Sequence, residues 1–228
     1  RFVYNKAIRE TVLIKAVLWD FGGVLTSSPF EAFTQYEQAN GLPVDFIRSI
    51  NATNPDTNAW AQFESNQMSA QAFDAAFAAE SEARGHLIRG QSVLALLSGD
   101  IRPRMVQALK QIKQTHAVGC ITNNVKSGQG AGMARSESKA RAIAEVMALF
   151  DTVIESSLVG IRKPNPEIYL MACRALSIDP TQALFIDDLG INLKPAKALG
   201  MTTIKVLNEA QALQDLSAAL GLALPSQA

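Results

Sequence analysis

Cysteine is scarce in this 228-residue sequence, which contains only two of these residues. Cys120 lies in the apolar run AVGCI and Cys173 in a helical pattern. Their spacing matches neither a zinc site nor a disulfide framework. We therefore expect two buried free thiols, which fits a reducing compartment, and a cytoplasmic location.

Net charge and long apolar runs are also lacking. The 21 basic and 21 acidic residues cancel, so no overall field attracts nucleic acid or an anionic membrane surface. No apolar stretch approaches the ~20 residues needed to cross a bilayer, and residues 1–9 lack the apolar core of a signal peptide. With 48% hydrophobic and 18% charged residues, the composition is that of a globular protein with neither nucleic acid nor membrane as partner. The oligomeric state stays open.

The zero net charge conceals a division along the chain. Residues 26–100 hold nine carboxylates and three arginines, a charge of −6, and the remainder carries +6. This division suggests two structural units with different surfaces, although uneven solvated faces explain it equally well.

Five short apolar runs rich in β-branched residues predict buried strands. They span residues 14–19, 118–122, 152–154, 183–186 and 202–206. Amphipathic helical patterns follow or separate them at 103–114, 136–149, 166–176, 193–199 and 209–220. Strands that alternate with helices predict an α/β fold with a doubly wound, Rossmann-like parallel sheet, covered by helices on both faces.

Residues 27–98 break this alternation. The segment has no β-branched run, and eight of the fifteen aromatic residues lie between positions 26 and 100, several at helical spacings. We therefore divide the chain into an α/β core, residues 11–26 and 99–228, and a helical cap, residues 27–98. Most of the aromatic rings are expected to form a small core of the cap, and some to face a cleft.

The polar residues that matter for chemistry stand at the predicted strand ends, because ligands of an open parallel sheet bind at its carboxyl edge. The first strand is followed by Asp20 and two glycines, which permit a sharp turn. The second ends in Thr122 and Asn123, and the fourth is followed by the pair Asp187–Asp188. A proline-containing loop after the third strand carries Lys163.

Three carboxylates at one rim repel one another, and a hard divalent cation such as Mg²⁺ relieves this repulsion through oxygen ligands. Lysine and threonine would complete an anion site suited to a phosphoryl group. Each residue alone also has a structural explanation, such as a helix cap for the aspartate pair. Four such groups in order at four strand ends favour the chemical interpretation.

The sequence resembles the haloacid dehalogenase superfamily in four ordered motifs, namely LWDFGGVLT, CITNN, VGIRKPNPEIY and FIDDLGINLKPAKALGM. The last two are especially similar to the N-terminal phosphatase domain of soluble epoxide hydrolase. The resemblance covers nearly the whole chain, with residues 27–98 where the family carries a helical cap. It implies a Mg²⁺-dependent phosphohydrolase that acts on a small phosphorylated substrate through an aspartyl-phosphate intermediate.

The resemblance also assigns roles to individual residues. Asp20 would be the nucleophile and a metal ligand, with Asp187 as the second carboxylate ligand and Gly22 as a backbone carbonyl ligand. Thr122, Asn123 and Lys163 would bind the phosphoryl oxygens. Two further residues would hold the water shell of the metal and orient the lysine: Asp188 and Asn192.

One departure from the family pattern concerns Gly22. Phosphatases of the family usually carry an aspartate there, which protonates the leaving alcohol. A general acid typically contributes ~10²–10⁴-fold to the rate, roughly 3–5 kcal/mol, so its absence would penalise alkyl phosphates more than phosphates with acidic leaving groups.

Two alternatives follow from this departure. A 2-haloacid dehalogenase needs no acid for its halide, but it lacks a metal and has no use for the aspartate pair. A non-catalytic binding module on a degenerate phosphatase scaffold is motivated by Gly22 alone. The sequence does not identify the substrate.

Overall fold

The structure, a computed structural model, describes residues 13–124 and 137–225. It contains one parallel five-stranded sheet in the order β3-β2-β1-β4-β5. The strands are β1 (Ala16–Trp19), β2 (Ala117–Thr122), β3 (Thr152–Glu155), β4 (Ala183–Asp187) and β5 (Thr202–Lys205). All five predicted strands are confirmed to within two residues, and so is the α/β fold class.

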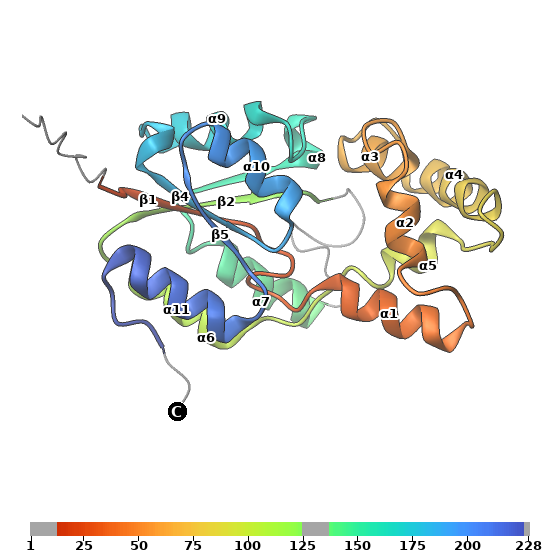
Figure 1. Ribbon diagram of the computed structural model, residues 1–228, viewed down its shortest axis with the longest axis horizontal. Helices are drawn as coiled ribbons and strands as arrows, with labels where there is room; N and C mark the ends of the chain where they lie inside the picture. The colour runs from red at the N-terminus through yellow and green to blue at the C-terminus, as the bar shows by residue number, and fades with distance from the viewer. Residues whose placement is uncertain (1–12, 125–136, 226–228) are drawn as a thin grey trace, which may run out of the picture.

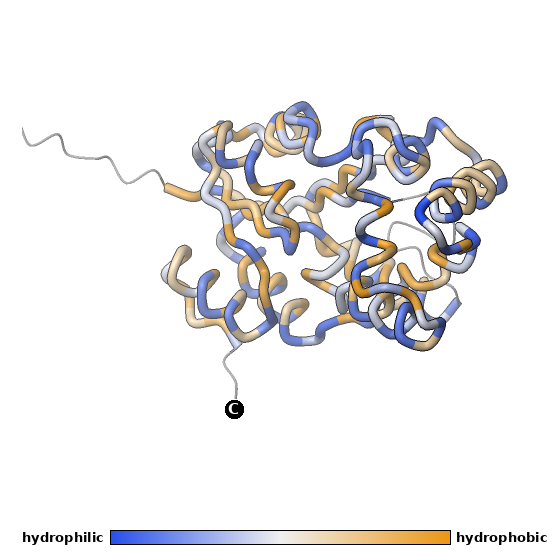
Figure 2. The backbone as a smooth tube through the Cα atoms, turned by 45° about the vertical axis from the view of Figure 1, so that its right-hand side comes forward, coloured by the Kyte–Doolittle hydropathy of each residue, from blue (hydrophilic) through white to orange (hydrophobic). Residues whose placement is uncertain are grey.

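Helices cover both faces of the sheet (Figure 1). One face carries α6 (Pro103–Ile112), α7 (Glu137–Met147) and α11 (Glu209–Leu220), and the other carries α8 (Ser156–Val159), α9 (Pro166–Ala175) and α10 (Gly190–Ala198). Side chains alternate across a strand. In β1, Val17 and Trp19 therefore pack with the α6, α7 and α11 side of the sheet, and Leu18 packs with the α9 and α10 side. Figure 2 shows the resulting hydrophobic stretches in the interior.

Residues 27–98, all of which the structure describes, contain helices and no strand. The helices are α1 (Pro29–Ala39), α2 (Phe46–Ala52), α3 (Ala59–Glu64), α4 (Ala70–Glu82) and α5 (Gly90–Leu94). They lie together beyond the carboxyl ends of the strands (Figure 1). We call residues 27–98 the helical segment.

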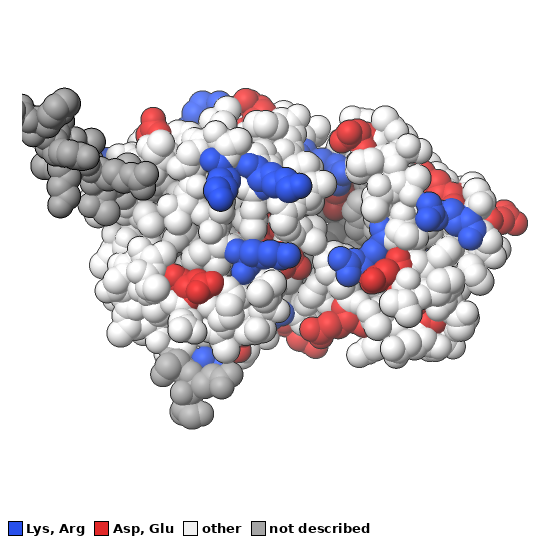
Figure 3. All heavy atoms as spheres, in the orientation of Figure 1, with Lys and Arg blue, Asp and Glu red and all other residues white. Residues whose placement is uncertain are grey.

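The helical segment has an apolar cluster separate from the two clusters of the sheet. At its centre Phe73 stacks on Phe63, with ring centroids 4.6 Å apart, and packs against Phe77. Most of the aromatic residues of the segment belong to this cluster, so their main role is packing, as the sequence predicts. Figure 3 shows a hollow between the helical segment and the α/β part, with charged side chains at its rim.

Cys120 and Cys173 are both buried and free, which confirms the sequence prediction. Across the described part of the chain, no helix combines the length and apolar character that crossing a membrane requires. Parts of the predicted core, namely residues 11–12, 125–136 and 226–228, lie outside the described residues.

Candidate active site

The carboxyl edge of the sheet brings three carboxylates together. Asp20 follows β1, Asp187 ends β4 and Asp188 comes next. One oxygen from each of the three lies within 4.8 Å of the others. Two ligands of one Mg²⁺ ion, each at about 2.1 Å, are at most about 4.2 Å apart, so a small movement of the side chains suffices to bind a cation.

Asp20 is fixed by the sheet and by the turn that follows. Its N–H donates to the carbonyl of Ile186 at 2.9 Å, which extends the pairing of β1 with β4 by one residue. Its Oδ1 accepts a hydrogen bond from the Phe21 N–H at 2.7 Å. The turn requires Gly23, which has a φ of +76° and whose added Cβ would lie 2.2 Å from Asp188 Oδ2.

Lys163 is the cation of the cluster and is only 1% exposed. Its Nζ lies 2.7 Å from Asp20 Oδ1 and 2.8 Å from Asp187 Oδ2. Burial lowers the pKa of Lys163, but the Asp187 and Asp20 carboxylates more than offset this and hold the pKa above its usual value. Lys163 therefore remains charged.

The two adjacent aspartates have different surroundings. Asp187 is fully buried and accepts hydrogen bonds from Lys163, from the Leu189 N–H at 2.7 Å and from Asn192 Nδ2 at 3.0 and 3.1 Å. Asp188 is partly exposed, and its side chain accepts a long hydrogen bond from Ser28 Oγ at 3.5 Å. The hydrogen bonds commit Asp187 to protein partners and leave Asp188 accessible to a cation.

These contacts differ from two of the sequence-based expectations. Lys163 is oriented by Asp20 and Asp187, and Asn192 reaches it only through Asp187. The side chain of Asn123 accepts a hydrogen bond from the Lys163 N–H at 2.8 Å and donates to the Lys163 carbonyl at 3.0 Å. It therefore holds the loop that carries Lys163.

Burial also affects the acids of the site. Burial raises the pKa of Asp20 well above its usual value, with the Lys163 charge opposing and the two neighbouring aspartates adding to the rise. Burial raises the pKa of Asp188 to about 6, with a further contribution from the Asp187 charge. Three carboxylates and one ammonium leave an excess of negative charge at this edge, which a divalent cation matches.

Thr122 and Gly22 occupy the places that the motifs predict. Thr122 is the last residue of β2, beside β1, and is 3% exposed. Gly22 lies in the turn after Asp20, and its backbone is outside the left-handed region. A Cβ built on Gly22 meets no heavy atom within 4 Å in residues 13–124 and 137–225.

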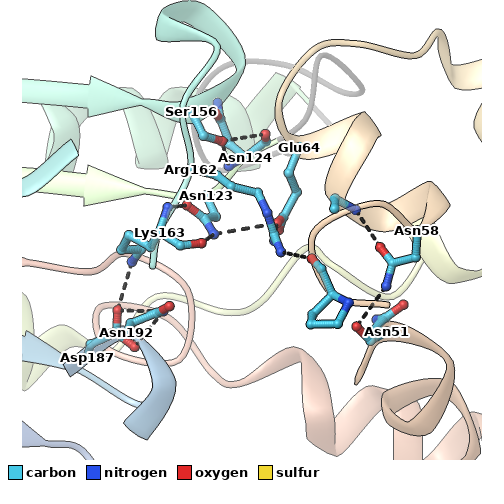
Figure 4. A network of polar contacts seen from close by, with 12 residues as sticks. Asn51, Asn58, Glu64, Asn123, Asn124, Ser156, Arg162, Lys163, Asp187 and Asn192 are labelled. Carbon is cyan, nitrogen blue, oxygen red and sulfur yellow. Dashed lines mark hydrogen bonds and ion pairs between the residues drawn. The ribbon is translucent and has the colours of Figure 1, made fainter. Parts of the chain in front are cut away.

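Glu64, at the end of α3, was not singled out by the sequence. It is 7% exposed, forms an ion pair with Arg162 and lies 3.5 Å from Asn123 Nδ2 (Figure 4). Burial raises the pKa of Glu64, and Arg162 opposes this rise. No motif marks it, because it is one of nine acids in the acidic part of the sequence.

The chain matches the haloacid dehalogenase-like hydrolases over residues 14–200 and belongs to this family. It is therefore a hydrolase, as the four motifs imply. It is 33% identical over 216 residues to mouse acyl-CoA dehydrogenase family member 10, and the match covers 92% of this chain and 19% of that protein. It is 31% identical over 223 residues to mouse bifunctional epoxide hydrolase 2, covering 93% of this chain and 40% of the relative. The chain thus spans less than half the length of these two relatives.

Other similarities extend over most of both proteins. The chain is 29% identical over 197 residues to phosphatase MT3486 of Mycobacterium tuberculosis, covering 82% of this chain and 85% of the phosphatase. A haloacid dehalogenase family enzyme of Bacteroides thetaiotaomicron, solved with magnesium and inorganic phosphate, superposes with a TM-score of 0.54 at 21% identity, covering 84% and 93% of the two chains. L-2-haloacid dehalogenase from Xanthobacter autotrophicus gives 0.58 at 18% identity, covering 91% and 83%. Both superpositions show the shared fold.

Proposed function

We propose that this hydrolase is a Mg²⁺-dependent phosphatase that cleaves a small phosphate ester through a phosphorylated Asp20. The observation that carries the proposal is the cluster of Asp20, Asp187, Asp188 and Lys163 at the carboxyl edge of the sheet. The names of two relatives support it, since one is a phosphatase and another was solved with magnesium and phosphate.

The donor atoms fit Mg²⁺. Carboxylate oxygens are the hard ligands that this ion prefers. Asp20 and Asp188, with the Gly22 carbonyl, are the proposed ligands, because the Asp187 oxygens are committed to Lys163, Leu189 and Asn192. This reverses the roles that the sequence assigned to the two adjacent aspartates. When bound by these residues, the ion would supply charge stabilisation for the phosphoryl oxygens.

The residues of the chain then divide the chemistry. Asp20 attacks phosphorus, and the Lys163 ammonium balances negative charge on the transferred group. Asp187, held by Asn192, fixes Lys163 between the two carboxylates. Thr122 is the proposed hydroxyl contact of the phosphoryl oxygens, and Asn123 positions the Lys163 loop.

The absence of a side chain at Gly22 limits the leaving groups. An alkoxide needs a proton as it departs. An aryl or acyl leaving group has a much smaller need for protonation. We infer that aryl and acyl phosphates are the better substrates, and that the helical segment acts as a cap that keeps water from the hollow during transfer.

A 2-haloacid dehalogenase is the second candidate. Gly22 favours it, because a halide leaves without protonation, and dehalogenases share the fold. The carboxylate of Asp188 argues against it, since a metal-free reaction gives this acid no cation to bind, and the side-chain bond that it accepts from Ser28 is long.

A panel of phosphate esters and 2-haloacids, assayed with Mg²⁺ and with a chelator, separates the two. The proposal expects release of inorganic phosphate that stops when the metal is removed. Halide release from a 2-haloacid that persists in chelator would overturn it, as would the absence of phosphate release from every ester.

A further inference from the structure

The buried ion pair between Glu64 and Arg162 links the helical segment to the loop that carries the proposed catalytic lysine (Figure 4). Arg162 is the residue before Lys163. Its second terminal nitrogen donates to the Pro55 carbonyl at 2.7 Å. The helical segment therefore binds this guanidinium through two groups, the Glu64 carboxylate and the Pro55 carbonyl.

Asn123 connects the same carboxylate to the backbone of Lys163. Its Nδ2 donates to the Lys163 carbonyl at 3.0 Å and lies 3.5 Å from Glu64 Oε2. Its Oδ1 accepts from the Lys163 N–H at 2.8 Å. The loop is closed by a hydrogen bond from the Asn165 N–H to the Arg162 carbonyl at 2.9 Å. Glu64 therefore contacts Arg162, which lies in the loop, and Asn123, which binds the backbone of Lys163.

The burial of this network makes it sensitive to the loss of one member. The side chains of Glu64 and Arg162 are 9% and 19% exposed, so the removal of either charge leaves the other poorly solvated. A different contact, from the Ser27 N–H to the Asp100 carbonyl at 2.7 Å, lies where the chain passes between the two parts. The Glu64 network instead reaches the Lys163 loop.

We propose that Glu64 is a positioning residue: through Arg162 and Asn123 it holds the Lys163 loop, so that turnover depends on the helical segment being docked on the α/β core. The inference rests on the proposed function in that Lys163 takes part in phosphoryl transfer. Glu64 itself touches neither Asp20 nor Asp187. Its effect is therefore on the placement of the ammonium, which is needed for the rate more than for affinity.

The test compares Glu64→Gln, Arg162→Gln and the double variant with Asp74→Asn. Asp74→Asn is the control variant, because it removes an ion pair with Arg89 that lies within the helical segment. With an aryl phosphate and saturating Mg²⁺, we expect Glu64→Gln to lower kcat by about 10- to 100-fold, the cost of a small misplacement of a catalytic group. KM should change by less than about 3-fold, and Asp74→Asn should stay near wild type. The double variant should be no slower than the slower single variant, because the two residues act as one unit.

Amide hydrogen exchange gives a readout that needs no turnover. Glu64→Gln should speed exchange at the N–H groups of Lys163 and Asn165, and Asp74→Asn should leave them unchanged. Wild-type kcat with unchanged exchange in Glu64→Gln would overturn the inference. So would faster exchange throughout the α/β core, because it would indicate general destabilisation. If the wild-type protein hydrolyses no phosphate ester, the proposed function fails, and exchange at these two groups alone decides whether Glu64 holds the loop.

Discussion

Replacement of Gly22 by aspartate tests whether the site lacks only a proton donor. The structure permits the change, because Gly22 has a backbone conformation outside the left-handed region and an added Cβ meets no atom of the described residues within 4 Å. A new acid at this position should therefore be gained without backbone strain.

The expected gain depends on the leaving group. For an alkyl phosphate, a positioned acid should raise kcat by about 10²- to 10⁴-fold. For an aryl phosphate the leaving group departs without help, so the rate should change little. The assay is release of inorganic phosphate from one alkyl and one aryl ester at saturating Mg²⁺, for wild type and Gly22→Asp.

Two controls frame this result. Gly22→Ala adds the Cβ without the carboxyl group and should leave both rates near wild type. Gly23→Ala should lower the rate of phosphate release from both esters. The φ of +76° at Gly23 disfavours a side chain, and an added Cβ would collide with Asp188. Equal wild-type rates on alkyl and aryl esters would refute the reasoning, since another acid would then already serve.

The remaining predictions concern the carboxylates. Asp20→Asn should abolish phosphate release, because an amide does not attack phosphorus; wild-type turnover would exclude covalent catalysis through Asp20. Asp188→Asn should raise the Mg²⁺ concentration needed for half-maximal activity, whereas Asp187→Asn should lower kcat at saturating Mg²⁺; titration of the metal distinguishes them, and the opposite pattern would restore the sequence-based assignment. Asp151→Asn should lower the free energy of unfolding by about 0.5–1 kcal/mol at pH 7, because the side chain is 39% exposed and water screens its charge. Burial raises the pKa of Asp151, but hydrogen bonds from a backbone N–H and from Lys113 more than offset this and hold the pKa below its usual value. The stability difference should therefore shrink as the pH falls below about 4, as urea unfolding would show, and a constant difference down to the lowest pH would contradict this.

The sequence predicted the strands and the residues at their ends because these depend on local pattern. Five apolar runs and the polar residues that follow them determine where Asp20, Thr122 and Asp187 lie once the sheet is parallel. The turn after β1 was predicted equally well from the sequence. Gly23 adopts a left-handed conformation, which accounts for a glycine at this position.

The roles of the two adjacent aspartates could not be read in the same way. Asp187 and Asp188 are chemically identical, and only the direction of each side chain decides which one meets Lys163 and Asn192. Glu64 was hidden for a related reason. Its partner Arg162 is distant in sequence, and a short helix without a motif does not reveal which of its acids is buried.

The contacts of Asp20 make its two carboxylate oxygens inequivalent. Oδ1 accepts from the Phe21 N–H and from Lys163, each at 2.7 Å, whereas Oδ2 receives no hydrogen bond from the described residues. A free carboxylate spreads its charge symmetrically and can present either oxygen, but here one oxygen is tied to the protein before any substrate arrives. In the proposed reaction the two oxygens therefore meet the metal and the substrate from different starting points, and the orientation of the carboxylate is set by the protein before either binds.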